Sequence, residues 1–242
     1  MALKSEELRY EADGLQMSGQ FMWDDAADGP RPGVLVFPEA FGLGGHALGK
    51  AERLVTELGY TALACDLHGE RKVYTKLEEV MPLLGELRSS ANSMRARTGK
   101  ALESLVARPE VDSSRTAAMG FCIGGAMSFE LALAGADIKA AIGFHSGLEL
   151  TSPQDAGQIK GKVLAMLGAD DPGITPEHRT AFQDMLTGAG VDWQVHLYGG
   201  VVHSYTNPDA AAMGMPDFAR YDAKADERSW NSMALLLKEV FA

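Results

Sequence analysis

Short apolar segments alternate with longer amphipathic segments along most of this chain. Apolar residues recur at helical spacing in residues 46–58, 76–107 with a break, 123–134, 176–188 and 222–241. Candidate strands occupy residues 33–38, 60–66, 115–121, 139–144, 162–168 and 192–198. Most of them are nearly continuous apolar runs, which are typical of strands covered on both faces. This alternation predicts an α/β fold, with a mostly parallel twisted sheet and helices on both of its faces.

Residues that typically begin and end helices support these boundaries. Thr175 can cap a helix that begins at Pro176, and a glycine follows the same helix. No repeat, low-complexity tract or linker interrupts the pattern, so we expect one domain over residues 1–242. Residues 206–226 are expected to form a long surface segment that borders a cleft. In an open α/β sheet the ligand site lies beyond the carboxyl ends of the strands, so residues that follow a strand are the first candidates.

Net charge and cysteine content limit the binding partners and the cellular compartment that we expect for this protein. The 242 residues include 33 acidic and 22 basic ones, for a formal net charge of -11. Nucleic-acid binding needs a basic surface, so no such partner is expected. Two cysteines, Cys65 and Cys122, are too few for a disulfide scaffold and fit a reducing compartment. Since no apolar leader and no apolar run of about 18 residues is present, we expect a cytoplasmic protein without a membrane partner.

Cys122 lies between glycines, where an apolar strand is predicted to end and a helix to begin. Residues 120–124 read G-F-C-I-G, the pattern of a nucleophile elbow with cysteine in place of serine. Side chains two positions to either side would collide at such a tight turn, which explains the glycines. The following helix directs its first N–H groups at the sulfur and favours the thiolate. The alternative is a buried structural cysteine packed between strand and helix.

An acid and a base follow Cys122 in the order that an elbow requires. Asp170 and Asp171 come after the strand predicted at 162–168, and His203 comes after the strand predicted at 192–198. One of the two aspartates is expected to serve only the turn, and we favour Asp171 as the acid. The alternative for His203 is an ordinary loop histidine.

Two backbone N–H groups must also converge on the oxyanion of an elbow enzyme. Ile123, directly after the nucleophile, supplies the first. The loop after the strand at 33–38 supplies the second, for which we choose Ala40, and its glycines allow the chain to pass close to a ligand. A phosphate-binding loop is the alternative here, but the stretch lacks both G-x-G-x-x-G and a P-loop lysine.

With these residues assembled, the chain resembles the dienelactone hydrolase family of α/β-hydrolases, whose nucleophile is a cysteine. The stretches that carry the resemblance occur in family order over nearly the whole chain: FPEAFGL, ACDLHGE, RPEVDSSRTAAMGFCIGGAMSFELA, GADDPGITPEH and YGGVVHSYTNP. The resemblance implies an α/β-hydrolase fold. It also implies five site positions, a triad of Cys122, Asp171 and His203 and oxyanion N–H groups from Ala40 and Ile123.

Glu39 and Asn207 bear on the substrate. In the family, a glutamate matching Glu39 contacts the resting thiol and helps to deprotonate it when substrate arrives, because a nearby carboxylate disfavours the thiolate until a ligand displaces it. The hydrolase that names the family has a substrate-binding arginine where this chain has Asn207. A neutral amide cannot replace a guanidinium, so we expect a neutral or aromatic ester to be at least as good a substrate as a dienelactone. Four aromatic residues are candidates for a pocket wall or for ordinary packing, namely Phe41, Tyr74, Tyr205 and Phe218.

The expected function is hydrolysis of a small-molecule carboxylic ester or lactone through a thioester on Cys122, with activated aryl or short-chain esters as substrates and phosphotriesters as a side activity. The alternative is a non-catalytic or redox-sensing thiol protein on a hydrolase fold. The six histidines show no metallohydrolase spacing, so neither a metal nor an organic cofactor is expected. We expect a monomer or a homodimer.

Overall fold

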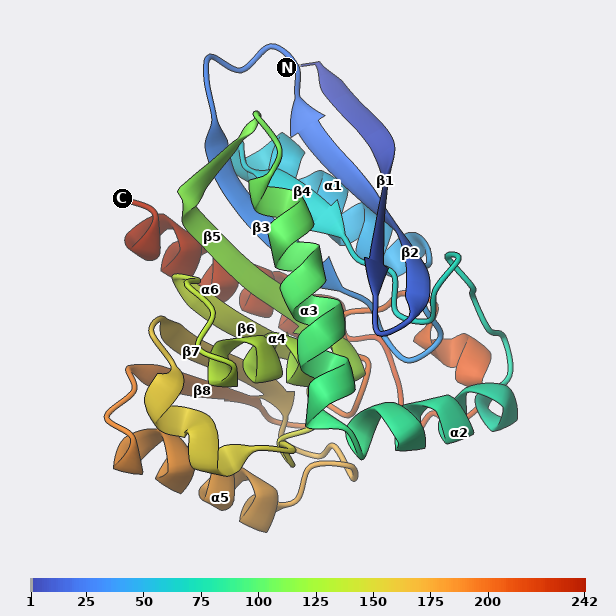
Figure 1. Cartoon of the computed structure of the whole chain (residues 1–242). Coiled ribbons are helices and arrows are strands. Elements are labelled where there is room, and N and C mark those ends of the chain that lie inside the picture. The colour runs from blue at the N-terminus through green and yellow to red at the C-terminus, as the bar shows by residue number, and fades with distance from the viewer. Residues whose placement is uncertain (1) are drawn as a thin grey trace.

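The computed structural model describes residues 2–242, which form an eight-stranded sheet in the order β1-β2-β4-β3-β5-β6-β7-β8 (Figure 1). The strands are β1 (Leu3–Ala12), β2 (Leu15–Asp24), β3 (Arg31–Phe37), β4 (Thr61–Ala64), β5 (Val111–Phe121), β6 (Ala140–Phe144), β7 (Lys162–Gly168) and β8 (Trp193–Tyr198). The helices are α1 (Gly45–Leu58), α2 (Leu77–Arg88), α3 (Ala91–Val106), α4 (Ile123–Leu133), α5 (Pro176–Gly188) and α6 (Ala223–Val240), with short 3-10 helices η1 (Pro153–Gln158) and η2 (Ala210–Met213).

All six predicted strands are present, as β3 to β8, and they pair in parallel. The central strands are buried on both faces, which is why their sequences are continuous apolar runs. β5 begins at Val111, earlier than the apolar run predicts, because its polar first residues pair with the start of β3 before a shift in register at Pro32. The prediction of a mostly parallel sheet is confirmed.

The apolar pattern does not predict β1 and β2, which form an antiparallel hairpin at one edge of the sheet. Residues of β1 alternate between exposed and half-buried positions instead of forming an apolar run. The signal for this hairpin is its turn, since Asp13 and Gly14 both have positive φ (54° and 70°) and an Asp-Gly pair is typical of a two-residue hairpin turn. β2 joins the parallel strands through antiparallel pairing with β4.

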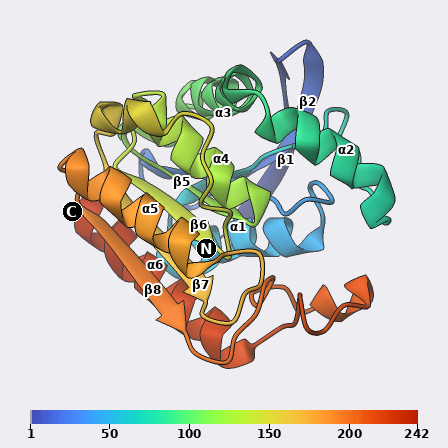
Figure 2. The same ribbon diagram turned by 90° about the horizontal axis from the view of Figure 1, so that it is seen from below.

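Helices cover the two faces of the sheet unequally (Figure 1, Figure 2). α2, α3, α4 and α5 contribute to one apolar core, and α1 and α6 contribute to the other. The helix predicted over 76–107 divides into α2 and α3, because the Ser90 side chain caps α3 by accepting from the Ser93 N–H. Thr175 caps α5 and Pro176 is its first residue, as the sequence predicts. None of the helices in residues 2–242 is long and apolar enough to cross a membrane.

Residues that follow β3, β5, β7 and β8 meet at the carboxyl edge of the sheet, since these strands are parallel. The segment 206–226, predicted to lie at the surface beside a cleft, contains η2 and supplies several residues to a cavity described below. The first residue of this segment does not lie at the surface as predicted, because Thr206 is fully buried.

Candidate active site

Cys122 occupies the sharp turn between β5 and α4, with φ 55° and ψ -120°. Residues other than glycine rarely adopt positive φ, so the turn holds the backbone of Cys122 in a strained conformation. Its backbone N–H donates to the carbonyl oxygen of Phe144 at 3.0 Å, which ties the turn to the end of β6. The Cys122 residue is only partly buried. The turn therefore presents the sulfur at the carboxyl edge of the sheet, as an elbow requires.

The glycines on either side of Cys122 have no room for a side chain. A Cβ on Gly120 would lie 2.1 Å from the carbonyl oxygen of Gly124. A Cβ on Gly124 would lie 2.4 Å from the carbonyl oxygens of both Phe37 and Pro38. Backbone atoms at these distances cannot move aside cheaply. The steric reason for the G-x-C-x-G pattern is thus present in the fold, and it brings α4 against the end of β3.

His203 and Asp171 are joined by a buried hydrogen bond of 2.7 Å between Nδ1 and Oδ2. The other carboxylate oxygen of Asp171 accepts from the backbone N–H of Gly173 at 2.8 Å, which fixes the orientation of the acid. Asp170 is exposed, whereas Asp171 is buried. Of the two aspartates that the sequence leaves open, Asp171 is the one that contacts the histidine.

The surroundings of His203 determine its charge. Burial alone would lower the pKa of His203, but the neighbouring Cys122 side chain and the hydrogen bond with Asp171 outweigh burial and raise it to about 10. The ring also stacks on Phe218, with 5.1 Å between ring centroids. An imidazolium is therefore favoured next to the sulfur.

Ala40, in the loop after β3, and Ile123, directly after Cys122, are the two residues whose backbone N–H groups the sequence predicts for an oxyanion site. Both residues are buried, and neither N–H donates a hydrogen bond to an acceptor within the described part of the chain. Ile123 is the first residue of α4, where N–H groups have no partner inside the helix. A buried N–H requires an acceptor from water or a ligand. These two groups are thus available to an oxyanion.

Glu39 is a buried carboxylate held by two side chains from the segment after β8. Ser204 Oγ donates to its Oε1 at 2.8 Å, and the side-chain amide of Asn207 donates to its Oε2. Burial raises the pKa of Glu39, although these hydrogen bonds oppose the rise. Within residues 2–242, Glu39 makes hydrogen bonds with Ser204 and Asn207 and none with Cys122. Asn207 instead acts as a partner of Glu39.

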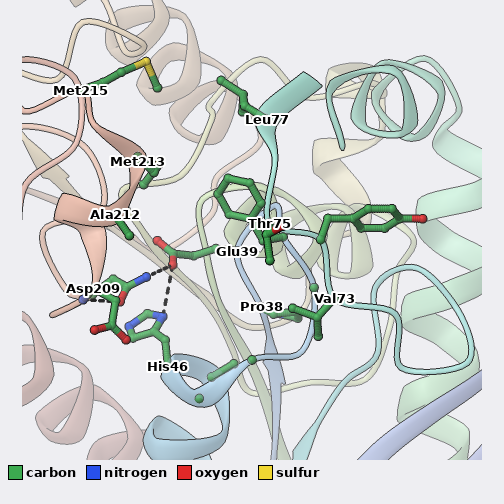
Figure 3. A pocket seen from close by; sticks show the side chains of 17 residues that line it. Pro38, Glu39, His46, Val73, Thr75, Leu77, Asp209, Ala212, Met213 and Met215 are labelled. Carbon is green, nitrogen blue, oxygen red and sulfur yellow. Dashed lines mark hydrogen bonds and ion pairs between the residues drawn. The ribbon is translucent and has the colours of Figure 1, made fainter. Parts of the chain in front are cut away.

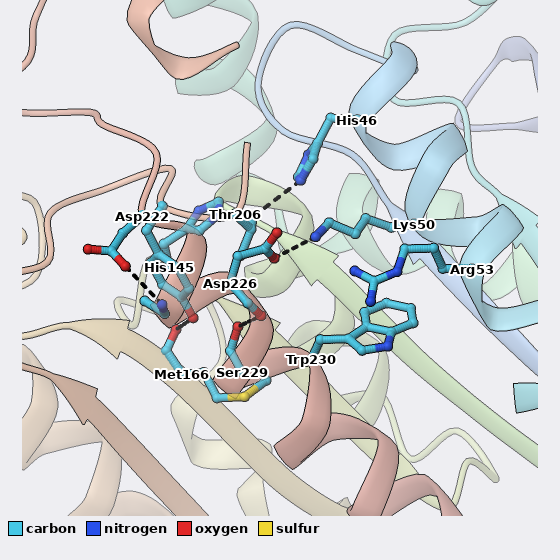
Figure 4. Close-up of polar contacts among 12 residues, drawn as sticks. His46, Lys50, Arg53, His145, Met166, Thr206, Asp222, Asp226, Ser229 and Trp230 are labelled. Atoms are coloured by element: carbon cyan, nitrogen blue, oxygen red, sulfur yellow. Dashed lines mark hydrogen bonds and ion pairs between the residues drawn. The ribbon is translucent and has the colours of Figure 1, made fainter. Parts of the chain in front are cut away.

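Two histidines that the sequence does not assign to the site lie near Glu39, and both contact the Thr206 side chain (Figure 4). His145 Nε2 and Thr206 Oγ1 are 2.8 Å apart, and the same hydroxyl is 3.2 Å from His46 Nε2. His46 Nδ1 lies 3.5 Å from Glu39 Oε2. Burial lowers the pKa of both histidines, that of His46 to about 3, so both are neutral. In the described residues no group of three or more His, Cys, Asp or Glu side chains could hold a metal ion.

A cavity of about 670 Å³ opens beside Glu39 (Figure 3). Phe41, Tyr74 and Asn207, three of the candidate substrate-binding residues, line it. Glu39 and Asn207 belong to its polar side, whereas much of the remaining wall is apolar and comes from two separate segments, through Val73, Leu77, Ala212, Met213 and Met215. The cavity can therefore take a large apolar group next to Glu39 and Asn207, and neither Cys122 nor His203 lines it.

Two of the aromatic candidates do not line this cavity, and the structure corrects their assignment. Tyr205 is fully buried, and its hydroxyl donates to the carbonyl oxygen of Met166 at 3.2 Å, so it belongs to the core. Phe218 supports the ring of His203. Apolar character alone does not distinguish a pocket wall from packing.

The family model for the dienelactone hydrolase family matches residues 19–241. A solved structure described as a dienelactone hydrolase-like promiscuous phosphotriesterase from metagenomic libraries is 42% identical, with 100% of each chain covered and a TM-score of 0.94. The solved structure m3DLH is 43% identical over 100% of each chain, with a TM-score of 0.96. An uncharacterized protein of Caenorhabditis elegans is 33% identical over 161 residues, which cover 62% of this chain and 95% of that protein. Together with the α/β-hydrolase architecture, these similarities show that the chain belongs to the dienelactone hydrolase family of hydrolases.

Proposed function

We propose that the protein hydrolyses carboxylic esters and lactones through a thioester on Cys122. The observation that carries this proposal is the buried hydrogen bond between Asp171 and His203. The side chain of Cys122 lies on the same histidine and helps to raise its pKa. A nucleophile, a base and an acid that orients the base are the components of covalent acyl transfer.

Acylation uses the thiolate and the imidazolium together. Cys122 Sγ attacks the carbonyl carbon, a C–S bond forms, and the carbonyl electron pair moves to the oxygen. The oxyanion accepts hydrogen bonds from the backbone N–H groups of Ala40 and Ile123, each of which is worth about 10²-fold in rate at comparable sites. As the ester C–O bond breaks, His203 gives its proton to the leaving oxygen, so the alcohol departs and a thioester remains.

Deacylation reverses the proton transfer. Neutral His203 takes a proton from water, and the oxygen attacks the thioester carbonyl. The C–S bond then breaks, which releases the acid and restores the thiolate beside the imidazolium. Esters suit this cycle better than amides, because a thiolate leaves a tetrahedral adduct more readily than an unprotonated amine does.

The charge and shape of the cavity favour a neutral substrate with an apolar arm. Glu39 already places a buried carboxylate at the polar side of the cavity, and Asn207 supplies an amide that is engaged with it. A second carboxylate on the substrate would meet like charge there without a cationic partner. The apolar wall accommodates an aryl or alkyl group.

A pre-steady-state experiment tests the proposal. Mixing the protein with p-nitrophenyl butyrate is expected to release a burst of nitrophenol equal to the enzyme concentration, because acylation by this activated ester is expected to be faster than hydrolysis of the thioester. Acid quenching during the burst, followed by peptide mass spectrometry, is expected to find one butyryl group on the peptide that contains Cys122. Turnover without any acyl group on this peptide would contradict the covalent route.

Phosphotriester hydrolysis is a second candidate, favoured by the similar solved structure described as a promiscuous phosphotriesterase. The thiolate of Cys122 would attack the neutral phosphorus and displace an aryl oxide, while the same two N–H groups receive the phosphoryl oxygen. We expect the wild type to release nitrophenol from paraoxon and Cys122→Ser to lose most of this activity. Equal rates in the two proteins would remove Cys122 from this reaction.

A further inference from the structure

Asp66 anchors the loop that follows β4. This carboxylate is 1% exposed, and its two oxygens accept hydrogen bonds from four backbone N–H groups, those of Ser18 (3.0 Å), His68 (3.1 Å), Gly69 (3.1 Å) and Arg71 (2.7 Å). Three consecutive loop residues, 69–71, have positive φ, which the N–H bonds to Asp66 maintain. The stretch ACDLHGE, which belongs to the family resemblance but has no part in the proposed chemistry, therefore forms a rigid loop.

His68 connects this rigid loop to Ala40. The distance from His68 Nε2 to the Ala40 carbonyl oxygen is 2.8 Å. A carbonyl oxygen can only accept, so Nε2 must carry the hydrogen. Burial lowers the pKa of His68, which keeps the ring neutral at neutral pH. The ring also meets Tyr74 edge to face at 5.0 Å between centroids, and Tyr74 donates its backbone N–H to Phe41.

Two successive peptide groups around Ala40 are held as a result. The Glu39 carbonyl, in the same peptide as the Ala40 N–H, accepts from the Gly42 N–H at 3.1 Å. His68 holds the next peptide through its carbonyl. Gly42 (φ 102°) makes this approach possible, since a Cβ there would lie 2.4 Å from the Lys72 carbonyl oxygen and 3.2 Å from His68 Cδ2. The direction of the Ala40 N–H thus depends on contacts with the loop anchored by Asp66.

We propose that His68 is a positioning residue of the oxyanion hole, which holds Ala40 so that its N–H faces the substrate oxygen. This inference rests on the proposed function, because it requires the Ala40 N–H to bind the oxyanion. His68 itself touches neither substrate nor sulfur. Its loss should therefore affect steps that form an oxyanion and leave other reactions of the Cys122 thiolate unchanged.

Comparing the rates of acylation and alkylation of Cys122 tests whether His68 affects only the steps that form an oxyanion. Attack of Cys122 on p-nitrophenyl acetate forms an oxyanion, whereas its attack on the saturated carbon of iodoacetamide does not. We expect His68→Leu to slow acylation about 10- to 100-fold, as for a misdirected oxyanion donor, and to leave the alkylation rate unchanged. His68→Gln, which keeps a side-chain N–H donor, is expected to recover most of the acylation rate. A Cys65→Ala background makes Cys122 the single cysteine of the chain.

Two results would overturn the proposal: an acylation rate in His68→Leu equal to wild type, or an equal loss of acylation and alkylation. If His68→Leu does not fold, His68→Asn serves the same comparison, because its shorter side chain cannot reach Ala40. Failure of the proposed function is a separate result, namely ester hydrolysis that survives in Cys122→Ala. The two failures are therefore distinguishable.

Discussion

Replacing Cys122 with alanine is expected to lower kcat for p-nitrophenyl butyrate by about 10⁴-fold or more, as for loss of a nucleophile in other covalent hydrolases. The substitution removes the sulfur and its C–S bond to the acyl group. Alanine at φ 55° bears the same backbone strain as cysteine, so the turn and the fold should persist. Steady-state rates, together with a thermal melting curve for each protein, measure the effect.

Cys65→Ala is the matched control. Cys65 is fully buried, its thiol donates to the Leu63 carbonyl oxygen at 3.4 Å, and burial raises the pKa of this thiol, so Cys65 is an unreactive packing residue. Because Cys65 takes no part in the proposed chemistry, we expect this variant to hydrolyse the ester at the wild-type rate. Hydrolysis that persists in Cys122→Ala would contradict the assignment of Cys122 as the nucleophile, whereas no hydrolysis by any of the three proteins would support the alternative of a non-catalytic or redox-sensing thiol protein.

Asp171→Asn is expected to reduce kcat/KM by about 10³- to 10⁴-fold at neutral pH, by analogy with other hydrolase triads. The amide can favour the wrong tautomer of His203 and cannot stabilise its imidazolium. Since the hydrogen bond with Asp171 helps to raise the pKa of His203 to about 10, the variant should also have a lower pKa at this ring. Acylation needs the protonated ring, so the alkaline fall of kcat/KM, expected near pH 10 in the wild type, should move to lower pH.

Asp170→Asn provides the control for this pH profile. Asp170 is adjacent in sequence but exposed, and its substitution also removes one negative charge from the turn. We expect a rate and an alkaline limb like those of the wild type. A wild-type profile in Asp171→Asn, or the same loss in Asp170→Asn, would contradict the assignment of Asp171 as the residue that orients His203.

Local chemistry explains what the sequence by itself determined about this protein. Continuous apolar runs predict β3, β4, β6 and β7 because the strands of a buried parallel sheet have no solvent face, whereas the edge strand β8 has only exposed and half-buried residues. The elbow at Cys122 is readable because steric exclusion acts on glycines only two positions away. The hairpin of β1 and β2 lacks such a run, and only its Asp-Gly turn indicates it.

Contacts between distant segments decided the rest. Asp171 rather than Asp170 meets His203, 32 positions away, because the turn after β7 buries one of two adjacent carboxylates and exposes the other. Asn207 reaches Glu39 across 168 positions, and Tyr205, two residues earlier, points into the core. Asp170 and Asp171 have the same side chain at adjacent positions, and Tyr205 and Asn207 are only two positions apart, so the local sequence does not show which of each pair meets the site. Burial and hydrogen bonding in the assembled fold separate them, since both depend on residues that the local sequence does not contain.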